Sequence, residues 1–443
     1  VSWCFSCVVS SVRMARPNIL FLSTDQQSSR ALSCAGNPDL HTPHMDALAA
    51  AGVRFDQAYC AAPVCGPSRA SLMTGRMPHE TGVLVNGMTP DPAIPNMGEL
   101  FRRAGYRTAW SGGWHLPDSG PQIRGFECLH DADIHLGHGS LADVHVTDRA
   151  IDFLQLDHDR PFFLGVSLCN PHDICRWLVS RPSAPQSEAG LPPLPSNFEP
   201  DPAEAEFIGQ CRQSDYCQGG THTSDWNELQ WRNYLKSYYR LTEEADVQVG
   251  RLMATLRATG LERETLVLFT SDHGEGLAAH RWVCKLMLYE EPVRVPFVVS
   301  WPGVIPAGAV DAEHLVSGLD VLPTLCSWAE VDFPEVTGIS LRPLIENRRE
   351  AGRTFLVTEL HADMEDVEEM QGRMLRTRRY KYVVFSRGRN PEMFFDLGED
   401  PGETRNLALE VEGDAELDRH RALMRQWCAQ TGDPFAATDV LNS

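Results

Sequence analysis

The sequence predicts an α/β fold in which helices cover both faces of a mostly parallel central sheet. Three observations lead to this prediction. Short apolar runs without helical periodicity recur along the chain, as buried parallel strands do. Helical segments that end at glycine separate these runs. The chain has 443 residues, of which 42% are hydrophobic, and this is enough for one large core or two smaller ones.

The N-terminal half alternates predicted strands with predicted helices. NILFLST at 18–24 is a predicted buried strand, and HMDALAAAGVRF at 44–55 predicts a short helix and the start of a strand. SRASLMTG at 68–75 predicts a helix that ends at a glycine. The next predicted elements are a helix and a strand in MGELFRRAGYRTAWSGG at 97–113, a helix in AIDFLQL at 150–156, and a buried strand in PFFLGVSLCN at 161–170.

The rest of the chain predicts a second sheet. A long amphipathic helix at 234–260 precedes predicted strands at 265–272 and 295–303, which complete the main domain at 14–345. Within it, the proline- and acid-rich segment 173–230 is expected to be an insertion near the mouth of the site. Residues 346–443 predict a small α+β subdomain, with antiparallel strands in RTFLVTEL, MLRTRRYKYVVFS and MFFDL and a helix in DAELDRHRALMRQWCAQTG.

Residues 1–13 are expected to be disordered or to lie upstream of the true start. The stretch VSWCFSCVVSSVRMA is only weakly apolar and has no basic residue before its apolar part, unlike a signal peptide. Met14 is the expected start, because the first predicted strand begins four residues later. This favours a cytoplasmic protein, and a truncated N-terminus would leave a periplasmic or secreted location open.

The composition limits the partners of the chain. Its formal net charge of -21 argues against general binding to nucleic acid or to an anionic membrane, because both need a basic face. No segment of the sequence is apolar over the length of a membrane span. The 13 cysteines are scattered without zinc spacing, and most are expected to be reduced thiols, with Cys211 and Cys217 as the nearest candidates for a disulfide. The sequence does not predict the oligomeric state.

Charged residues follow two predicted strands at the edge where ligands bind in such sheets. Asp25 follows the first strand, and Asp272 and His273 follow the strand at 265–272. A single aspartate there is more often a helix cap, but carboxylates that converge on one point repel unless a cation lies between them. Their oxygen atoms suit a hard divalent ion such as calcium, magnesium or manganese.

The stretch CGPSR at 65–69 places a nucleophile at the predicted start of a helix. Backbone N–H groups and the helix dipole favour an anion at this end. Arg69, four residues after Cys65, reaches the same face of the helix and can bind an oxyanion with its two-pronged guanidinium. Short patterns of this kind recur by chance, so the stretch indicates a function only together with longer motifs.

Such motifs are present, and the chain resembles the type I sulfatases of the alkaline phosphatase superfamily from Asn18 to about Leu407. The stretches that carry the resemblance are PNILFLSTDQQ, TPHMDALAAAGVRFDQAYCAAPVCGPSRASLMTGRMPHETGV, GYRTAWSGGWHLP, NPHD, TSDHGEGLAAHRWVCKLMLYEEPVRVPFVVSWPG and MFFDLGEDPGETRNLA. The resemblance implies an alkaline phosphatase-like α/β/α sandwich and hydrolysis of sulfuric esters. It also implies that a formylglycine-generating enzyme oxidises Cys65 to formylglycine.

The resemblance further implies a reaction and a set of residues. The aldehyde hydrates to a diol, one hydroxyl attacks the sulfur of the ester, and the other hydroxyl then releases sulfate. One divalent ion, with calcium favoured over manganese and magnesium, would be held by Asp25, Gln26, Cys65, Asp272 and His273. Arg69 would hold formylglycine and sulfate, and His115 would act in the collapse of the diol. His172 and Lys285 would bind sulfate, and one of them would protonate the leaving oxygen.

Two positions depart from the pattern of the family. Gln26 replaces a second aspartate, as in the branch that includes choline sulfatases and phosphonate monoester hydrolases. Gly113 replaces the lysine of the usual GKWH motif, which normally touches formylglycine. We expect a cation from elsewhere to compensate, and the sequence does not rank the candidates Arg76, Arg176 and Arg281.

Two other functions compete with sulfatase activity. The first is a phosphonate monoester or phosphodiester hydrolase on the same scaffold, although Gly113 removes positive charge that a doubly charged phosphate monoester would favour. The second is a silent binding protein, which the retention of Cys65, Arg69 and Lys285 argues against. NPHDICRW and LPPLPSNF are similar to bacterial polysaccharide sulfatases, including some that act on uronate 2-O-sulfates of heparin-like glycans, so the expected substrate is a sulfated small molecule or glycan.

Overall fold

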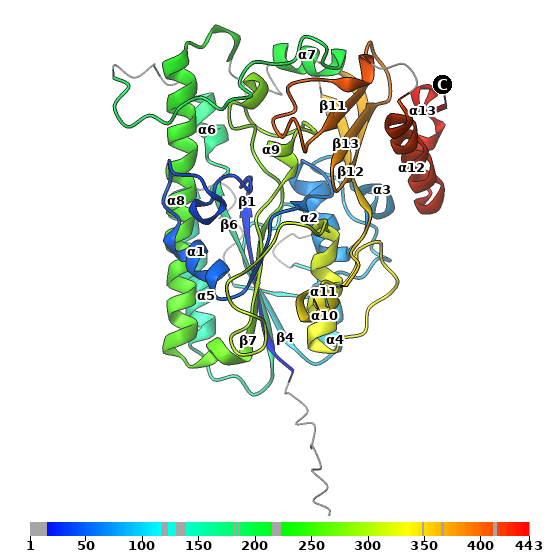
Figure 1. The fold of residues 1–443 in the computed structure, drawn as a ribbon. Helices are drawn as coiled ribbons and strands as arrows, with labels where there is room; N and C mark the ends of the chain where they lie inside the picture. The colour runs from blue at the N-terminus through cyan, green and yellow to red at the C-terminus, as the bar shows by residue number, and fades with distance from the viewer. Residues whose placement is uncertain are drawn as a thin grey trace, which may run out of the picture.

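A computed structural model describes residues 16–116, 123–129, 139–180, 183, 187–214, 223–347, 350–364, 367–410 and 414–442. Its central feature is a sheet of eight strands in the order β5-β4-β6-β1-β7-β8-β2-β9 (Figure 1). Five neighbouring strands run parallel: β5 (Glu127–Cys128), β4 (Arg107–Gly112), β6 (Phe162–Pro171), β1 (Asn18–Asp25) and β7 (Thr265–Ser271).

The far edge of this sheet changes direction. Strand β8 (Phe297–Ser300) is antiparallel to both β7 and β2 (Val53–Phe55), and β2 pairs in parallel with β9 (Ala309–Asp311). The prediction of a mostly parallel central sheet is therefore confirmed. All residues of β1 and β7 are buried, which explains why these strands read as continuous apolar runs.

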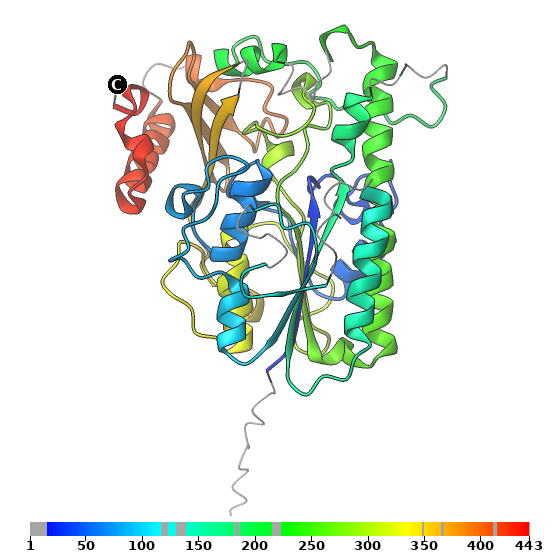
Figure 2. The ribbon, with the colours of Figure 1, turned by 180° about the vertical axis from the view of Figure 1, so that it is seen from behind.

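Helices cover both faces of the sheet (Figures 1 and 2). One face carries α1 (Pro43–Ala50), α5 (Gly139–Leu154) and α8 (Glu228–Ala258), which share a hydrophobic core with the sheet. The other face carries α2 (Cys65–Thr74), α4 (Met97–Arg103), α10 (Val321–Ala329) and α11 (Arg342–Glu346) over a second core. Helix α8 begins earlier than expected, because the Asn227 side chain caps it by accepting a hydrogen bond from the backbone of Gln230 at 3.1 Å.

Shorter elements connect these layers. A two-stranded parallel sheet pairs β3 (Ala58–Tyr59) with β10 (Val316–Ser317) just before α2. The short helices are α3 (Pro78–Thr81), α6 (Ile174–Val179), α7 (Glu206–Gln213) and α9 (Glu290–Val293).

The C-terminal part forms an antiparallel sheet, as predicted. Its strands are β11 (Phe355–Met364), β12 (Val367–Thr377), β13 (Tyr380–Phe385) and β14 (Glu392–Asp396), followed by α12 (Ala415–Thr431) and α13 (Asp439–Asn442). The segment MLRTRRYKYVVFS forms two strands, because it turns after Thr377, whose Oγ1 accepts a hydrogen bond from the Tyr380 backbone at 3.2 Å. Strand β11 also holds the segment before α2, since the Glu359 backbone donates to the carbonyl of Ala61 at 2.8 Å.

Several expectations stay predictions. The domain boundaries at residues 14 and 346 and the assignment of 173–230 as an insertion are of this kind. The extension at 1–13 and Cys217 lie outside the described residues; Cys211 is buried, and its disulfide with Cys217 stays a prediction. Among the described residues, no helix combines the length and the apolar character that a membrane span requires.

Candidate active site

Four adjacent strands place the candidate residues at one edge of the central sheet. Strand β1 ends at Asp25, and its neighbour β7 ends just before Asp272 and His273. On the other side of β1, β6 leads to His172, and β4 next to it leads to Gly113 and His115. The carboxyl ends of these strands therefore meet at one edge of the sheet, as the sequence predicts.

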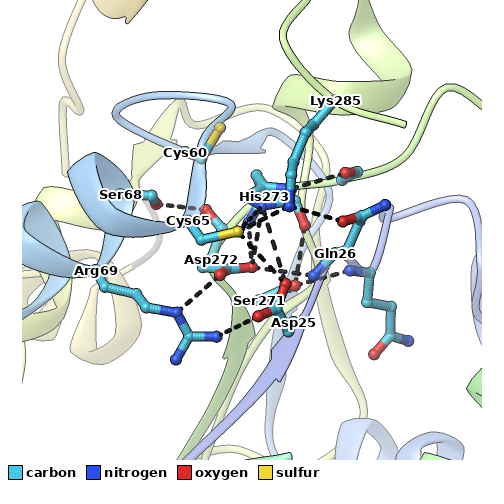
Figure 3. Close-up of polar contacts among 12 residues, drawn as sticks. Asp25, Gln26, Cys60, Cys65, Ser68, Arg69, Ser271, Asp272, His273 and Lys285 are labelled. Carbon is cyan, nitrogen blue, oxygen red and sulfur yellow. Dashed lines mark hydrogen bonds and ion pairs between the residues drawn. The ribbon is translucent and has the colours of Figure 1, made fainter. Parts of the chain in front are cut away.

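Cys65 is the first residue of α2 and is fully buried beside the ends of β1 and β7 (Figure 3). Its Sγ lies 2.8 Å from Nζ of Lys285 and 3.1 Å from Nε2 of His273. The Ser68 hydroxyl, one turn further along α2, donates to the backbone carbonyl of Asp272 and fixes the helix against β7. The predicted nucleophile therefore lies at a helix N-terminus and close to two cationic or titratable side chains.

Arg69 bridges the two predicted carboxylates. Its Nη2 donates to Oδ2 of Asp25 at 2.9 Å, and its Nε donates to Oδ2 of Asp272 at 3.0 Å. Its Nη1 donates to the carbonyl of Gly113 and to Oγ of Ser167, each at 2.9 Å. Arg69 is thus held rigidly, and it neutralises one oxygen of each carboxylate while the Oδ1 atoms remain on the side of Cys65 and His273.

His273 is oriented for ligand binding by its own backbone neighbour. Its Nδ1 lies 2.9 Å from the carbonyl of Gly274, so Nδ1 carries a proton and Nε2 faces the cluster, where it could bind a metal ion after losing its own proton. Potential ligand atoms of Asp25, Cys65, Asp272 and His273 all lie within 4.8 Å of one another, and all four side chains are buried. The donor set of two carboxylates, an imidazole and the Cys65 position fits one divalent ion.

The charges of this cluster depend on each other. Burial raises the pKa of Asp272, and the nearby charge of Asp25 raises it further. Burial also acts to raise the pKa of Asp25, but the charges of His172, Arg69 and Lys285 outweigh it and lower this pKa below its usual range. Two buried carboxylates that repel in this way are stabilised by a cation between them.

Lys285 and Gln26 form the wall of the cluster opposite Arg69 (Figure 3). Nζ of Lys285 donates to Oε1 of Gln26 at 3.0 Å as well as contacting Cys65. Burial acts to lower the pKa of Lys285, but the charges of Cys65, Cys175 and Asp25 raise it well above its usual value, so Lys285 stays cationic. The Gln26 side-chain oxygen therefore faces Lys285, and its predicted role as a metal ligand stays a prediction.

A cavity of about 480 Å³ opens beside the cluster. Its walls include Asp25, Arg69, Gly113, His115, His172 and Arg176. Interaction with the Cys65 side chain raises the pKa of His115. The backbone of His115 has a φ of 61°, an unusual left-handed conformation that often marks functional sites.

Gly113 leaves open the space that the family lysine would use. A Cβ atom built on Gly113 would meet only Oγ of Ser167 at 3.9 Å. All three candidate arginines pair with a carboxylate, Arg176 with Asp173, Arg76 with Glu80 and Arg281 with Glu199, but of the three only Arg176 lines the same cavity. The structure therefore ranks Arg176 first among the three arginines that could compensate for the missing lysine.

We expect Gly113→Lys to lower turnover rather than raise it. The new ammonium would enter a cavity wall that already carries Arg69 and Arg176, and the like charges would compete for the same anion. A charge-assisted contact is worth roughly 1.5–3 kcal/mol, so the expected change is about ten- to a hundredfold. Gly113→Met, which has similar bulk without charge, separates crowding from charge in the same kcat measurement. A tenfold rise in kcat with lysine would show that the site lacked a cation.

Two polar residues of the site, Ser167 and Asp143, were not predicted from the sequence. Ser167 is a polar residue inside the apolar run of β6, and this interruption could have indicated its contact with Arg69. Asp143 lines the cavity and accepts hydrogen bonds from the backbone of Asn170 at 2.9 Å and of Cys169 at 2.5 Å. Burial raises the pKa of Asp143 to about 7. Asp143 lies among apolar residues on one face of α5, and this position in the sequence pattern could have indicated a buried functional carboxylate.

Comparison with known proteins places this geometry in a family. Residues 17–331 match the Sulfatase family, and residues 278–426 match the family described as N-sulphoglucosamine sulphohydrolase, C-terminal. A Delta 4,5-hexuronate-2-O-sulfatase of Bacteroides thetaiotaomicron is 32% identical, over 98% of this chain and 93% of that protein. An ulvan-active sulfatase of Formosa agariphila is 31% identical, over 96% of this chain and 83% of that protein.

Solved structures agree with the sequence relatives. A 2-O GAG sulfatase superposes with a TM-score of 0.86 at 30% identity, covering 95% of this chain and 93% of that chain. The phosphonate monoester hydrolase of Agrobacterium radiobacter superposes with a TM-score of 0.77 at 23% identity, over 94% of this chain and 96% of that chain, and this likeness shows the fold alone. The chain therefore belongs to the sulfatase family and is an enzyme that hydrolyses sulfate esters.

Proposed function

We propose that this sulfatase removes a 2-O-sulfate from a hexuronate in an acidic glycan or its fragments. The cavity beside the buried cluster carries the proposal. Its volume of about 480 Å³ suits one or two sugar units, since ligand sites usually span about 300–1,000 Å³. Its walls hold Arg69 next to the cluster and Arg176 further out, so a substrate with two anionic groups can meet both guanidinium groups. The hexuronate-2-O-sulfatase and the ulvan-active sulfatase among the relatives support an acidic glycan.

The cluster would hold one divalent ion, and we propose calcium. Asp25, Asp272 and His273 would be ligands, together with formylglycine at the position that the Cys65 side chain occupies in the structure. Oxidation replaces the sulfur of Cys65 with oxygen, which makes the donor set harder and favours calcium. A bound ion would neutralise charge on the sulfate oxygens. A formylglycine-generating enzyme is the proposed partner for maturation.

The side chains around Cys65 divide the remaining work. Arg69 and Lys285 lie on opposite sides of Cys65 (Figure 3). They would therefore bind the sulfate group from two sides and hold it in one orientation. His115 lines the same cavity, its pKa is raised by the Cys65 side chain, and it would move a proton at that side chain. His172 lines the cavity that receives the sugar and is the proposed donor of the proton to the leaving oxygen.

The role of His172 predicts a dependence on the leaving group. We expect His172→Ala to lower kcat on a sugar sulfate by about a hundredfold or more, which is the usual contribution of a general acid. The same change should affect an aryl sulfate with an acidic phenol much less, because that leaving group departs without a proton. His145→Ala, on the exposed side of α5, is the control and should leave both rates unchanged. Equal losses on both substrates would assign His172 to binding instead.

Arg176 provides the test of the substrate class. Its Nε lies 3.4 Å from Oδ1 of Asp173, which keeps the guanidinium at the cavity wall. We expect Arg176→Ala to raise KM about tenfold for a 2-O-sulfated hexuronate disaccharide, because one charge-assisted contact is lost. The KM for N-acetylglucosamine 6-sulfate, which has no carboxylate, should change little, and Arg176→Lys should recover part of the loss. Equal losses of affinity for both substrates would instead assign Arg176 to the sulfate group, as compensation for the missing lysine at position 113 requires.

A further inference from the structure

Two cysteines that take no part in the proposed reaction lie together behind Lys285. Sγ of Cys175, in the first turn of α6, is 4.0 Å from Sγ of Cys284, the residue directly before Lys285. Cys175 is partly exposed and Cys284 is buried. The two residues are 109 positions apart, and they connect the helix after the NPHD motif to the loop that carries the sulfate-binding lysine.

This thiol pair is in direct contact with the active site. The Gln26 amide nitrogen donates to Sγ of Cys175 at 3.3 Å, and Oε1 of the same Gln26 accepts from Lys285 at 3.0 Å. Lys285 in turn reaches Cys65 at 2.8 Å. A change at the two sulfur atoms can therefore move Lys285 by two routes. One runs from Cys175 through the Gln26 side chain, and the other through the peptide bond between Cys284 and Lys285.

The loop that carries Cys284 has an unusual backbone. Leu277, Ala278, His280, Arg281, Cys284 and Leu286 all have positive φ values, and that of Cys284 is 64°. Residues in this region are held by their surroundings at a cost of about 1–3 kcal/mol each. Release of this strain would offset part of the cost of the short movement that brings the sulfur atoms from 4.0 Å to the bond length of about 2.05 Å.

We propose that Cys175 and Cys284 form a reversible disulfide that switches the sulfatase off under oxidising conditions. The oxidant would be a hydroperoxide. The Cys175 thiolate attacks the peroxide oxygen and becomes a sulfenic acid, with release of one water or alcohol. The Cys284 thiol then attacks this sulfur and expels one water as the S–S bond forms. The two thiols lose two protons and two electrons in total, and the peroxide O–O bond is reduced.

The disulfide alters two contacts that the reaction uses. Cys175 leaves its hydrogen bond with Gln26, and Cys284 draws the backbone of Lys285 toward α6. Loss of the charge-assisted contact between Lys285 and the sulfate corresponds to a fall in kcat/KM of about ten- to a hundredfold. A thiol reductant should restore the original value.

The test uses the matured enzyme, in which Cys65 no longer offers a thiol. The protein is treated with hydrogen peroxide, free thiols are alkylated, and tryptic peptides are analysed before and after reduction. We expect the peptide Trp282–Lys285, released by cleavage after Arg281 and Lys285, to be joined to the peptide that ends at Arg176. Sulfatase activity is measured on the same samples. For each protein, the activity of the oxidised sample is divided by the activity of the sample after reduction.

The variants separate this switch from general damage by oxidation. Cys284→Ser and Cys175→Ser should lose the peptide link, and the activity ratio should rise to nearly one. Cys34→Ser removes another partly exposed thiol outside the site and should respond like the parent protein. The proposal fails if peroxide inactivates the parent without the link, or if the link forms without loss of activity. Because the link is measured by mass, it can be tested even if the proposed glycan is not the substrate.

Discussion

Cys65→Ala is expected to reduce sulfate release by about a thousandfold or more, because it removes the nucleophile that the rest of the site is built around. Cys65 is fully buried at the start of α2, and its Sγ contacts Lys285 at 2.8 Å and His273 at 3.1 Å. Neither neighbour can replace it, since a protonated lysine has no lone pair and His273 faces the metal position. The measurement is the rate of inorganic sulfate release from a sulfated sugar.

A nearby thiol provides the matched control for this variant. Cys60 is also buried, but its Sγ points toward the carbonyl of Pro292 at 3.9 Å and not toward the cluster (Figure 3). Cys60→Ala should therefore retain most of the activity. If Cys65→Ala kept a tenth of the parental rate, another group would have to be the nucleophile.

Asp272→Ala is expected to remove both the metal ion and activity. The Oδ1 atom of Asp272 lies 3.8 Å from Nε2 of His273, and Oδ2 holds Arg69 at 3.0 Å, so one change removes a ligand and releases the arginine. A metal ion contributes several kcal/mol to the stabilisation of charge in the transition state, which corresponds to a loss of about a thousandfold.

Thermal unfolding measures the metal site without reference to activity. A ligand that binds only the folded protein raises Tm, so added calcium should raise the Tm of the metal-depleted parent. Asp272→Asn keeps the shape of the side chain and is therefore expected to fold. Added calcium should not raise the Tm of this variant. Asp246→Asn is the control, because Asp246 is buried outside the site and accepts hydrogen bonds from the backbone of His44 and Met45. Full activity in a metal-free preparation would contradict the proposed site.

The sequence was sufficient to predict the parts of the fold and site that depend on local signals. The strands β1, β6 and β7 are buried on both faces, so their apolar runs are continuous and easily recognised. The polar residues directly after them, such as Asp25 and Asp272, are then placed at one sheet edge by the rule for parallel sheets. The glycine that ends α2 is similarly visible, since Gly75 adopts a left-handed φ of 69°.

Features that depend on contacts between distant segments could not be predicted in this way. The Cys175–Cys284 pair spans 109 residues, and neither cysteine has a local pattern that indicates the other. The Arg69–Ser167 hydrogen bond similarly joins α2 to β6. The preference for Arg176 over Arg76 and Arg281 depends on the residues that line the cavity, and no local sequence pattern distinguishes the three arginines.

The most direct test of a formylglycine-dependent sulfatase relates activity to the chemical state of Cys65. Co-expression with different amounts of a formylglycine-generating enzyme yields preparations in which mass spectrometry of the Cys65 peptide gives the converted fraction. The rate of sulfate release per mole of protein is then measured on one sulfated hexuronate disaccharide and on one aryl sulfate. We predict that the rate on at least the aryl sulfate rises in proportion to the converted fraction and extrapolates to zero for unmodified Cys65. A rate that is independent of conversion, or no activity on either ester at full conversion, would contradict the account.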